Sequence, residues 1–481
     1  MCLLTLAMGA RGEIAFGART QIWPFLFADQ AGGSPGQTTD QRVKYEVATG
    51  NLDRYRELGA TWNIVDVWQD VDGPDGFRRL DRVFNEHERR GIEVALRLLE
   101  RQKIYDEIRS GGEAAANALR EYRQWIQQIA RRYGTRVRYY MISNETDHDI
   151  GYNSPAYRAF RRISVDEYRE LLRTAYESIH AVDARLKVAD HGVSSYSLAL
   201  AVMADLATAG RPGDALAFWR SMAYEVPDDG ERTLPRLLGR LANAESRRRI
   251  EFARRSTAEL TTYRDVYQLH HYYGPVPLPA VLEWIRGQLA RTDASQPIVA
   301  AEVGYLIPAK KGTSWDGRPV SIADMSRYSA VSHGTSIAQT IATLAGHGIN
   351  DILYWQIRFH TAHHGPAASL FPAAQSRDDF RWIYPAEVFR FVAREMTGAS
   401  PMAPTPGLRE GDLVEYRFQR NGDFSLLWTT DGKAITIPPA LRTRIDRMVD
   451  AAGRPVGPAS ANGDIGTAPV FVYWQSQTAG K

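Results

Sequence analysis

The sequence predicts an α/β fold: a (β/α)8 TIM barrel followed by a small C-terminal antiparallel β-sandwich domain. Between residues 20 and 400, short apolar runs alternate with longer helical stretches, which is the pattern of a parallel sheet with crossover helices. Two of these runs end in glutamates, Glu145 and Glu302, at a spacing that about three β/α units of a barrel would cover. Beyond Pro401 the apolar runs become short and alternating, as in antiparallel strands.

The expected strands are apolar runs of roughly four to eight residues between turns and helical patterns. The first lies within residues 20–27, and the others cover 61–67, 93–99, 137–143, 186–190, 266–272, 298–301 and 352–357. The expected helices cover residues 77–90, 113–132, 164–180, 326–347 and 385–396. Ser164 followed by Glu167 forms a capping-box pattern, which predicts that a helix begins there.

The domain boundaries follow from these elements. Residues 1–19 are expected to be an N-terminal tail or a remnant signal, residues 20–400 the barrel and residues 408–481 the β-sandwich, with a proline-containing linker at 402–408. The expected strands of the sandwich are 413–418, 424–428, 434–437 and 469–473. Within the barrel, 211–264 exceeds the length of one barrel helix, so we expect a helical insertion with solvated basic faces. Its clustered arginines are Arg247, Arg248, Arg249, Arg254 and Arg255.

Composition restricts the kind of partner. The chain has 481 residues, of which 44% are hydrophobic, enough for a large core and a smaller second domain. Its 59 basic and 56 acidic side chains give a net charge of +3, so a nucleic acid or an anionic membrane is not the expected partner. Cys2 is the single cysteine, which excludes an internal disulfide framework and a thiolate metal site.

The two strand-end glutamates are the main candidates for chemistry. A glutamate at the end of a buried strand is costly to keep unless it is paired or hydrogen-bonded, and barrel active sites lie at the carboxyl ends of the strands. Asn144, beside Glu145, can hold a sugar hydroxyl or the partner carboxylate. Two carboxylates on different strands suit cleavage of a glycosidic bond. The structural alternatives are a helix cap for the Asn144-Glu145 pair and a salt-bridged core position for Glu302.

The sixth expected strand carries two pairs of polar aromatic side chains. His270 and Tyr272 lie on one face of this strand, and His271 and Tyr273 lie on the other. We expect His270 and Tyr272 to face the mouth of the barrel. A tyrosine or histidine there can donate a hydrogen bond to an ionised carboxylate and so hold its pKa low.

Further candidates are aromatic and polar residues that follow other strands. The tryptophans can stack on the apolar face of a sugar ring, although tryptophan is also ordinary core material. The polar residues can bind substrate or stabilise loops, and their spacing matches no recognisable metal motif. The substrate-binding candidates in this group are Trp68, Asp190, His191, Tyr305 and Trp355, with Asp147, His148 and Asp149 forming a second polar group.

In combination, these motifs resemble clan A of the retaining glycoside hydrolases. The resemblance rests on Asn144-Glu145, the His270-x-Tyr272 element, Glu302 and Trp355. Within the clan, the chain is similar to family 39 and its bacterial exopolysaccharide-linked relatives. The matching segments at the start of the barrel are Leu58-Gly59-Ala60-Thr61-Trp62, Trp68, Phe77, Leu80-Asp81 and Gly91-Ile92. The resemblance covers roughly residues 20–400, and the trailing β domain also fits the family.

The resemblance implies a role for each matched residue. Glu145 corresponds to the acid/base, Glu302 to the nucleophile, Asn144 to the residue that contacts the sugar 2-hydroxyl, and Tyr272 to the hydrogen-bond partner of the nucleophile. A retaining double displacement is therefore expected, with the two carboxyl groups ~5–5.5 Å apart rather than the ~6.5–9.5 Å of an inverting pair. The resemblance further implies an oligo- or polysaccharide substrate and a reaction that needs no metal or organic cofactor.

The sequence departs from the clan pattern in two places. Thr146 replaces the proline that often follows the Asn-Glu pair, and no arginine occurs around Asn63 and Ile64 on the second strand, where one commonly supports the nucleophile. Arg97 on the third strand is the candidate substitute. The missing arginine is also the reason for the main alternative, a non-catalytic glycan-binding protein on a hydrolase-like barrel.

A metal-dependent barrel hydrolase that uses His270, His271 and Asp190 is a third hypothesis. The His-x-His expected on the first strand of such enzymes is absent from residues 20–27. The apolar run at residues 2–10 ends in small residues, as a signal-peptide core does, although no basic residue precedes it. Together with a polysaccharide substrate, this favours a secreted or periplasmic location over a cytoplasmic one. No segment approaches the ~20 apolar residues of a membrane span.

Overall fold

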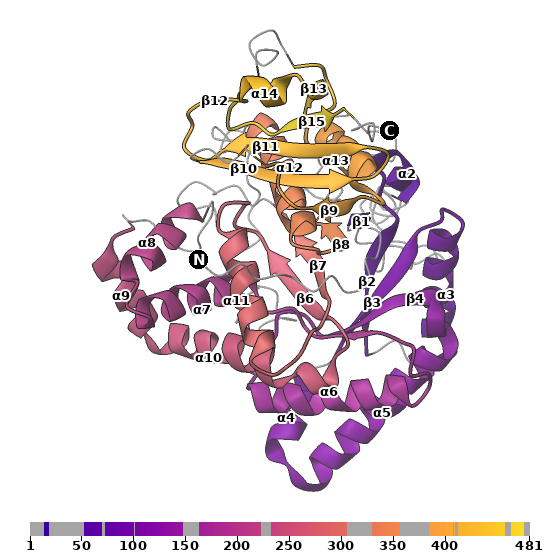
Figure 1. The fold of residues 1–481 in the computed structure, drawn as a ribbon. Helices are drawn as coiled ribbons and strands as arrows, with labels where there is room; N and C mark the ends of the chain where they lie inside the picture. The colour runs from indigo at the N-terminus through magenta and orange to yellow at the C-terminus, as the bar shows by residue number, and fades with distance from the viewer. Residues whose placement is uncertain are drawn as a thin grey trace, which may run out of the picture.

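A parallel sheet surrounded by helices and an antiparallel sheet packed beside it form the described part of the chain (Figure 1). The structure is a computed structural model. It describes residues 14–18, 52–69, 73–100, 102–147, 163–222, 232–304, 330–355, 384–406, 408, 412–456 and 463–475. Within these ranges, no helix is both long enough and apolar enough to cross a membrane.

The parallel sheet has eight strands in the order β5-β4-β3-β2-β1-β8-β7-β6. They are β1 (Ala15–Ala18), β2 (Trp62–Trp68), β3 (Glu93–Leu99), β4 (Val137–Ile142), β5 (Val188–Ala189), β6 (Tyr267–His271), β7 (Ile298–Val303) and β8 (Asp351–Tyr354). Isolated parallel bridges join residues near the two ends of this order: Ala189 bridges Val266, and Val193 bridges Leu269. The carboxyl ends of the strands therefore lie at one edge of the sheet.

The first strand does not lie where the sequence analysis placed it. Residues 20–27 are outside the described residues, and β1 lies at Ala15–Ala18, in the segment expected to be a tail. It pairs with β2 and β8, and Ile14 and Phe16 are fully buried. The expectation was wrong because the longer apolar run at 20–27 gave a stronger pattern than a four-residue strand that ends in Gly17 and Ala18. The other seven expected strands overlap β2 to β8.

A second apolar cluster, separate from the core that the helices share, lies on the parallel sheet. Its members come from all eight strands or the residues beside them, so this cluster joins every strand to the others. The buried members are Trp62, Ile64, Ala95, Met141, Ala189, Val266, Val299, Ala301 and Leu353, with Ala15 and Tyr139 packed against them.

The helices lie on the outer face of the sheet and share with it the larger apolar core (Figure 1). Up to β5 they are α2 (Tyr55–Leu58), α3 (Gly73–Glu88), α4 (Gln102–Ser110), α5 (Gly112–Tyr133) and α6 (Val165–His180). After β6 they are α11 (Leu278–Ala290), α12 (Ala330–Gly346) and α13 (Tyr384–Met396). The predicted capping box of α6 is confirmed: the Ser164 hydroxyl accepts from the Glu167 N–H at 3.2 Å, and the Glu167 carboxylate accepts from the Ser164 N–H at 2.7 Å.

Among the described residues between β5 and β6, four α-helices precede a short 3-10 helix, and three of the four lie within the expected insertion at 211–264. They are α7 (Ser195–Thr208), α8 (Pro212–Ser221), α9 (Leu234–Ala242) and α10 (Ala244–Glu259). The arginines of α10 do not simply face water. Arg248 and Arg249 pair with Glu245, and Arg255 pairs with Asp166. The pairs with Glu245 lie within α10 at i,i+3 and i,i+4 spacing. The pair with Asp166 joins α10 to α6.

The C-terminal part contains a five-stranded antiparallel sheet in the order β13-β15-β11-β10-β9 and a two-stranded sheet β12-β14. The elements are β9 (Ser400–Met402), β10 (Leu413–Gln419), β11 (Asp423–Thr429), β12 (Ile435–Thr436), α14 (Pro439–Arg442), β13 (Ile445–Asp450), β14 (Asp464–Ile465) and β15 (Val470–Trp474). One face of the larger sheet lies next to α12 and α13, where the Phe391 and Phe471 rings meet edge to face at 4.9 Å (Figure 1). Residues of the other face pack with α14, β12 and β14.

A polar contact crosses the inside of the parallel sheet near the amino ends of the strands. Asp351, the first residue of β8, accepts hydrogen bonds from the Arg138 guanidinium and the Tyr139 hydroxyl of β4. Three strands separate β4 from β8 in the sheet order, so this contact ties distant strands together.

We predict that Asp351→Ala destabilises the protein by about 2–3 kcal/mol, because it removes the shared acceptor and leaves the largely buried Tyr139 hydroxyl unpaired. The measurement is the free energy of unfolding in urea. Asp214→Ala is the control, since Asp214 forms an exposed pair with Arg211 and should cost less than about 0.5 kcal/mol. Equal losses in both variants would contradict the role given to Asp351.

Candidate active site

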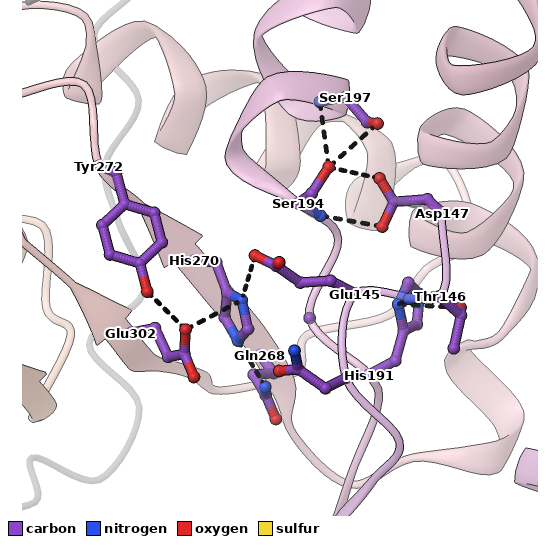
Figure 2. Close-up of polar contacts among 12 residues, drawn as sticks. Glu145, Thr146, Asp147, His191, Ser194, Ser197, Gln268, His270, Tyr272 and Glu302 are labelled. Carbon is purple, nitrogen blue, oxygen red and sulfur yellow. Dashed lines mark hydrogen bonds and ion pairs between the residues drawn. The ribbon is translucent and has the colours of Figure 1, made fainter. Parts of the chain in front are cut away.

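Side chains from β3, β4, β6 and β7 meet at the carboxyl edge of the parallel sheet. Glu145 follows β4, Glu302 is the fifth residue of β7, His270 is in β6, and Tyr272 directly follows β6. Figure 2 shows the Glu145 and Glu302 carboxylates pointing toward the His270 ring from opposite sides, with Tyr272 above Glu302. The alternation along β6 thus places His270 and Tyr272 together, as predicted.

Both oxygens of the Glu302 carboxylate accept a strong hydrogen bond. The Arg97 guanidinium donates to Oε1 at 2.5 Å, and the Tyr272 hydroxyl donates to Oε2 at 2.5 Å. Glu302 is only 4% exposed. A guanidinium and a phenol that donate to one carboxylate favour its ionised form, and Glu302 has little contact with water.

Arg97 joins residues of two strands, β2 and β7, and of the turn that follows β4. Besides Glu302, it donates to the Asn144 side-chain oxygen at 2.5 Å and to Asp66 at 2.8 Å. Burial lowers the pKa of the Arg97 guanidinium, but the charges of Asp66 and Glu302 more than offset this and raise it above its ordinary value. Arg97 therefore carries a permanent positive charge beside the nucleophile candidate, which is the position that a second-strand arginine was expected to fill.

The two residues of β2 where an arginine was expected, Asn63 and Ile64, have partners other than Glu302 in the structure. The Asn63 side chain points away from the site and bonds the His87 ring at 3.0 Å, while Ile64 belongs to the second apolar cluster. Asp66, two residues further along β2, is the residue that reaches Arg97.

Glu145 has a different environment from Glu302. Its Oε1 lies 2.9 Å from His270 Nδ1, which is also 3.8 Å from Oε2 of Glu302. The Gln268 amide lies 2.7 Å from His270 Nε2 and donates to it, so Nδ1 carries the ring proton and donates to Glu145. The candidate ligand atoms of Glu145, His270 and Glu302 all lie within 4.8 Å of one another.

The backbone around Asn144 is strained. Ser143 and Glu145 have φ values of 69° and 43°, and they are two of the three non-glycine residues with positive φ in the described ranges. Such a conformation costs of order 1–3 kcal/mol and persists only where surrounding contacts hold it. Here the Ser143 N–H donates to the Leu98 carbonyl at 2.8 Å, and the Glu145 N–H donates to the His191 carbonyl at 2.9 Å.

The site also constrains the neighbouring strands. The β6-β7 register shifts between Leu269 and His270, after which His270 pairs with Glu302. Such irregularities beside active sites turn side chains toward each other. Gly192, with φ 62°, passes beneath the imidazole: a Cβ there would lie 2.5 Å from His270 Nε2, so only glycine fits.

Two of the expected substrate-binding residues lie beneath the site rather than in it. Asp190 is fully buried, pairs with the Arg264 guanidinium, and accepts from the Gln268 backbone N–H at 3.0 Å. His191 is also fully buried, with its Nδ1 3.2 Å from the Thr146 hydroxyl, and burial lowers its pKa. Asp190 and His191 therefore stabilise the ends of β4 and β5. Their polar groups are bonded to protein or buried, so they do not face the site.

The remaining candidates from the sequence are the aromatic residues and the second polar group, and not all of them lie within the described residues. Trp355 directly follows β8, is partly exposed, and meets the Tyr272 ring edge to face at 5.5 Å. Trp68 ends β2, is partly exposed, and lies two residues after Asp66, on the same side of the strand. Tyr305 lies outside the described residues, as do His148 and Asp149 of the second polar group. Asp147 is buried and accepts from the Ser194 N–H and hydroxyl at the start of α7 (Figure 2).

The metal set considered from the sequence does not converge. The His271 ring bonds the Gly274 carbonyl at 2.6 Å, and burial lowers its pKa to about 4. The Asp190 carboxylate already forms an ion pair with the Arg264 guanidinium. Among the described residues, Glu145, His270 and Glu302 have the spacing of metal ligands instead, but the Arg97 cation already lies against Glu302.

Two site residues escaped the sequence analysis. Gln268 lies two residues before His270, on the same face of β6, so strand alternation alone could have found it. Asp66 lies two residues before Trp68 in the same way. Each is the partner of a recognised side chain, His270 or Arg97.

Searches of protein-family models and of curated proteins gave no match. The structure is similar to that of a family 39 glycoside hydrolase from the gut symbiont Bacteroides cellulosilyticus WH2, with a TM-score of 0.55 and 14% identity, over 96% of this chain and 80% of that one. It is also similar to a family 39 β-xylosidase from Caulobacter crescentus, with a TM-score of 0.50 and 11% identity, over 97% and 98% of the two chains. At these identities the likeness establishes the fold, and at that level the resemblance to family 39 of clan A is confirmed.

Proposed function

We propose that this protein is a retaining glycoside hydrolase that cleaves O-glycosidic bonds of an oligo- or polysaccharide. The observation that carries the proposal is the contrast between two neighbouring glutamates. Glu302 is held ionised by Arg97 and Tyr272, whereas the described contacts of Glu145 include no arginine or lysine. Two carboxyl groups in different environments are what an acid and a nucleophile require.

The spacing of the two glutamates favours retention over inversion. One oxygen of each carboxylate lies within 4.8 Å of the other, which is nearer to the ~5–5.5 Å separation of carboxyl groups in retaining enzymes than to the ~6.5–9.5 Å of an inverting pair. In the proposed reaction, Glu302 attacks the anomeric carbon while protonated Glu145 gives its proton to the leaving oxygen. Glu145 then takes a proton from the water that releases the sugar from the glycosyl ester.

The neighbouring residues have supporting roles in this proposal. Asn144, fixed through its side-chain oxygen by Arg97, presents its amide N–H₂ group to the sugar 2-hydroxyl. Trp355 offers an aromatic face beside Tyr272 for the apolar side of the sugar ring. His270 donates to Glu145 and thereby stabilises its carboxylate after proton transfer.

We also propose that the eight parallel strands form a closed (β/α)8 barrel with a small C-terminal β-sandwich. The bridges between the β5 and β6 ends support closure, as does the second apolar cluster, to which all eight strands contribute. The apolar cluster between the larger antiparallel sheet and the β12-β14 pair supports the sandwich.

The main test compares wild type, Glu145→Gln and Glu302→Gln on a panel of polysaccharides and aryl glycosides. Aryl β-xylosides belong in the panel because a similar structure is described as a β-xylosidase. On polysaccharides and on aryl glycosides whose leaving group needs a proton, we expect kcat/KM to fall by about a thousandfold or more in both variants, since the two groups act as a unit. Proton NMR of the first product should show the anomeric configuration of the substrate.

Glu177→Gln is the matched control, because Glu177 lies exposed on α6 and should keep wild-type activity. Release of the inverted anomer would contradict the retaining mechanism. Sugar binding without turnover, unaffected by Glu302→Gln, would instead identify a glycan-binding protein. The position of Arg97 removes the main reason for that alternative, because the positive charge beside Glu302 is present.

We predict that chelation leaves the activity unchanged, because Arg97 rather than a metal ion supplies the positive charge beside Glu302. The measurement is turnover before and after dialysis against EDTA. Loss of turnover that a divalent cation restores would show that Glu145, His270 and Glu302 bind a metal ion.

A further inference from the structure

A buried carboxyl group that the proposed reaction does not use lies close to the acid/base candidate. Glu100 directly follows β3 and is 2% exposed. Its Oε1 accepts hydrogen bonds from the Ser143 hydroxyl at 2.6 Å and from the Tyr105 hydroxyl. Among the described residues, neither hydrogen bond nor ion pair joins Glu100 to a basic side chain, which is unusual for a buried carboxyl group.

The surroundings of Glu100 favour its neutral form. The tyrosines that interact with it come from three helices: Tyr105 from α4, Tyr122 from α5 and Tyr168 from α6. Burial raises the pKa of Glu100, and the hydrogen bonds from Ser143 and Tyr105 only partly offset this. A neutral carboxylic acid keeps a carbonyl oxygen that accepts both hydroxyl groups and avoids the cost of a buried charge.

The hydrogen bond to Ser143 connects this group to the strained turn. Ser143 has a φ of 69° and immediately precedes Asn144 and Glu145. The Ser143 hydroxyl is its side-chain anchor, and the Tyr168 hydroxyl holds the preceding carbonyl, that of Ile142, at 2.8 Å. A non-glycine residue stays in this conformation only where such contacts fix it.

We infer that Glu100 is a positioning residue that anchors Ser143 and thereby aims Asn144 and Glu145 at the glycosidic bond. This inference rests on the proposed function, since it concerns the delivery of the Glu145 proton. It assigns no contact with substrate to Glu100. Glu302 is held independently by Arg97 and Tyr272, so its attack should not depend on this anchor.

The test uses two aryl glycosides of the same sugar, one with a phenyl and one with a 2,4-dinitrophenyl leaving group. Phenolate leaves slowly without a proton, whereas dinitrophenolate needs no acid. We predict that Glu100→Leu and Ser143→Gly lower kcat/KM for the phenyl glycoside by about tenfold to a hundredfold, and for the dinitrophenyl glycoside by about threefold or less. Glu100→Gln, which keeps the accepting carbonyl, should lose less than Glu100→Leu on the phenyl glycoside.

The controls separate positioning from general damage to the core. Ser178→Ala removes a buried serine hydroxyl in α6 that bonds the Thr174 carbonyl, and it should not change the ratio between the two substrates. Equal losses on both glycosides would overturn the inference while leaving the proposed function intact. A wild type that cleaves no glycoside of the panel would overturn the proposed function itself.

The protonation of Glu100 gives an independent prediction. Because its pKa is raised in the folded state, the folded protein holds a proton that the unfolded chain releases above about pH 4.5. Wild type should therefore lose stability relative to Glu100→Gln as the pH rises through the interval between the two pKa values. Urea midpoints of both proteins from pH 4 to pH 8 measure this, and a constant or opposite difference would show that Glu100 is ionised.

Discussion

The buried guanidinium of Arg97 is the constraint on which the site depends. It fixes the relative positions of β2, β4 and β7 through Asp66, Asn144 and Glu302. Enclosing a guanidinium is costly, and two carboxylates are needed to offset that cost. The charges of Arg97, Asp66 and Glu302 sum to −1. In the proposed reaction this cluster therefore stabilises the positive charge that develops at the anomeric carbon. One arginine thus sets both the geometry and the electrostatics of the site.

The second constraint is the backbone of the Ser143-to-Glu145 turn. Glycine would adopt its positive φ angles more easily, but glycine has no side chain to supply a carboxylate or an anchoring hydroxyl. The strain is therefore retained, and contacts from β3, from the segment after β5 and from α6 maintain it. The strained backbone costs local stability but directs the Glu145 side chain toward Glu302 and His270. Such strain is common at functional sites.

The sequence alone predicted the parts of the structure that follow from periodicity. Apolar runs located β2 to β8, and alternation along β6 placed His270 with Tyr272. Arg97 was only a candidate for the support of Glu302, and its contact with Asn144 was not predicted, because these contacts depend on the register of β3 with β4 and on the approach of β7 from across the sheet. The sequence left open whether Asp190 and His191 bind substrate or stabilise loops. Their burial beneath a strand end depends on the packing of helices such as α6 and α10, which local pattern does not contain. The four-residue strand β1 could not be located from the sequence either, because the longer apolar run at 20–27 has a stronger strand pattern.

The attachment of the C-terminal sheet determines how the molecule unfolds. Phe418, Phe424 and Phe471 belong to the same apolar cluster as the helices around the parallel sheet, and Gly346 at the end of α12 leaves space for the Tyr416 ring. The helices around the parallel sheet and the larger antiparallel sheet therefore share one apolar core where they meet. Heating should therefore melt both parts in one cooperative transition, and a chain cut near residue 400 would expose an aggregation-prone apolar face on α12 and α13.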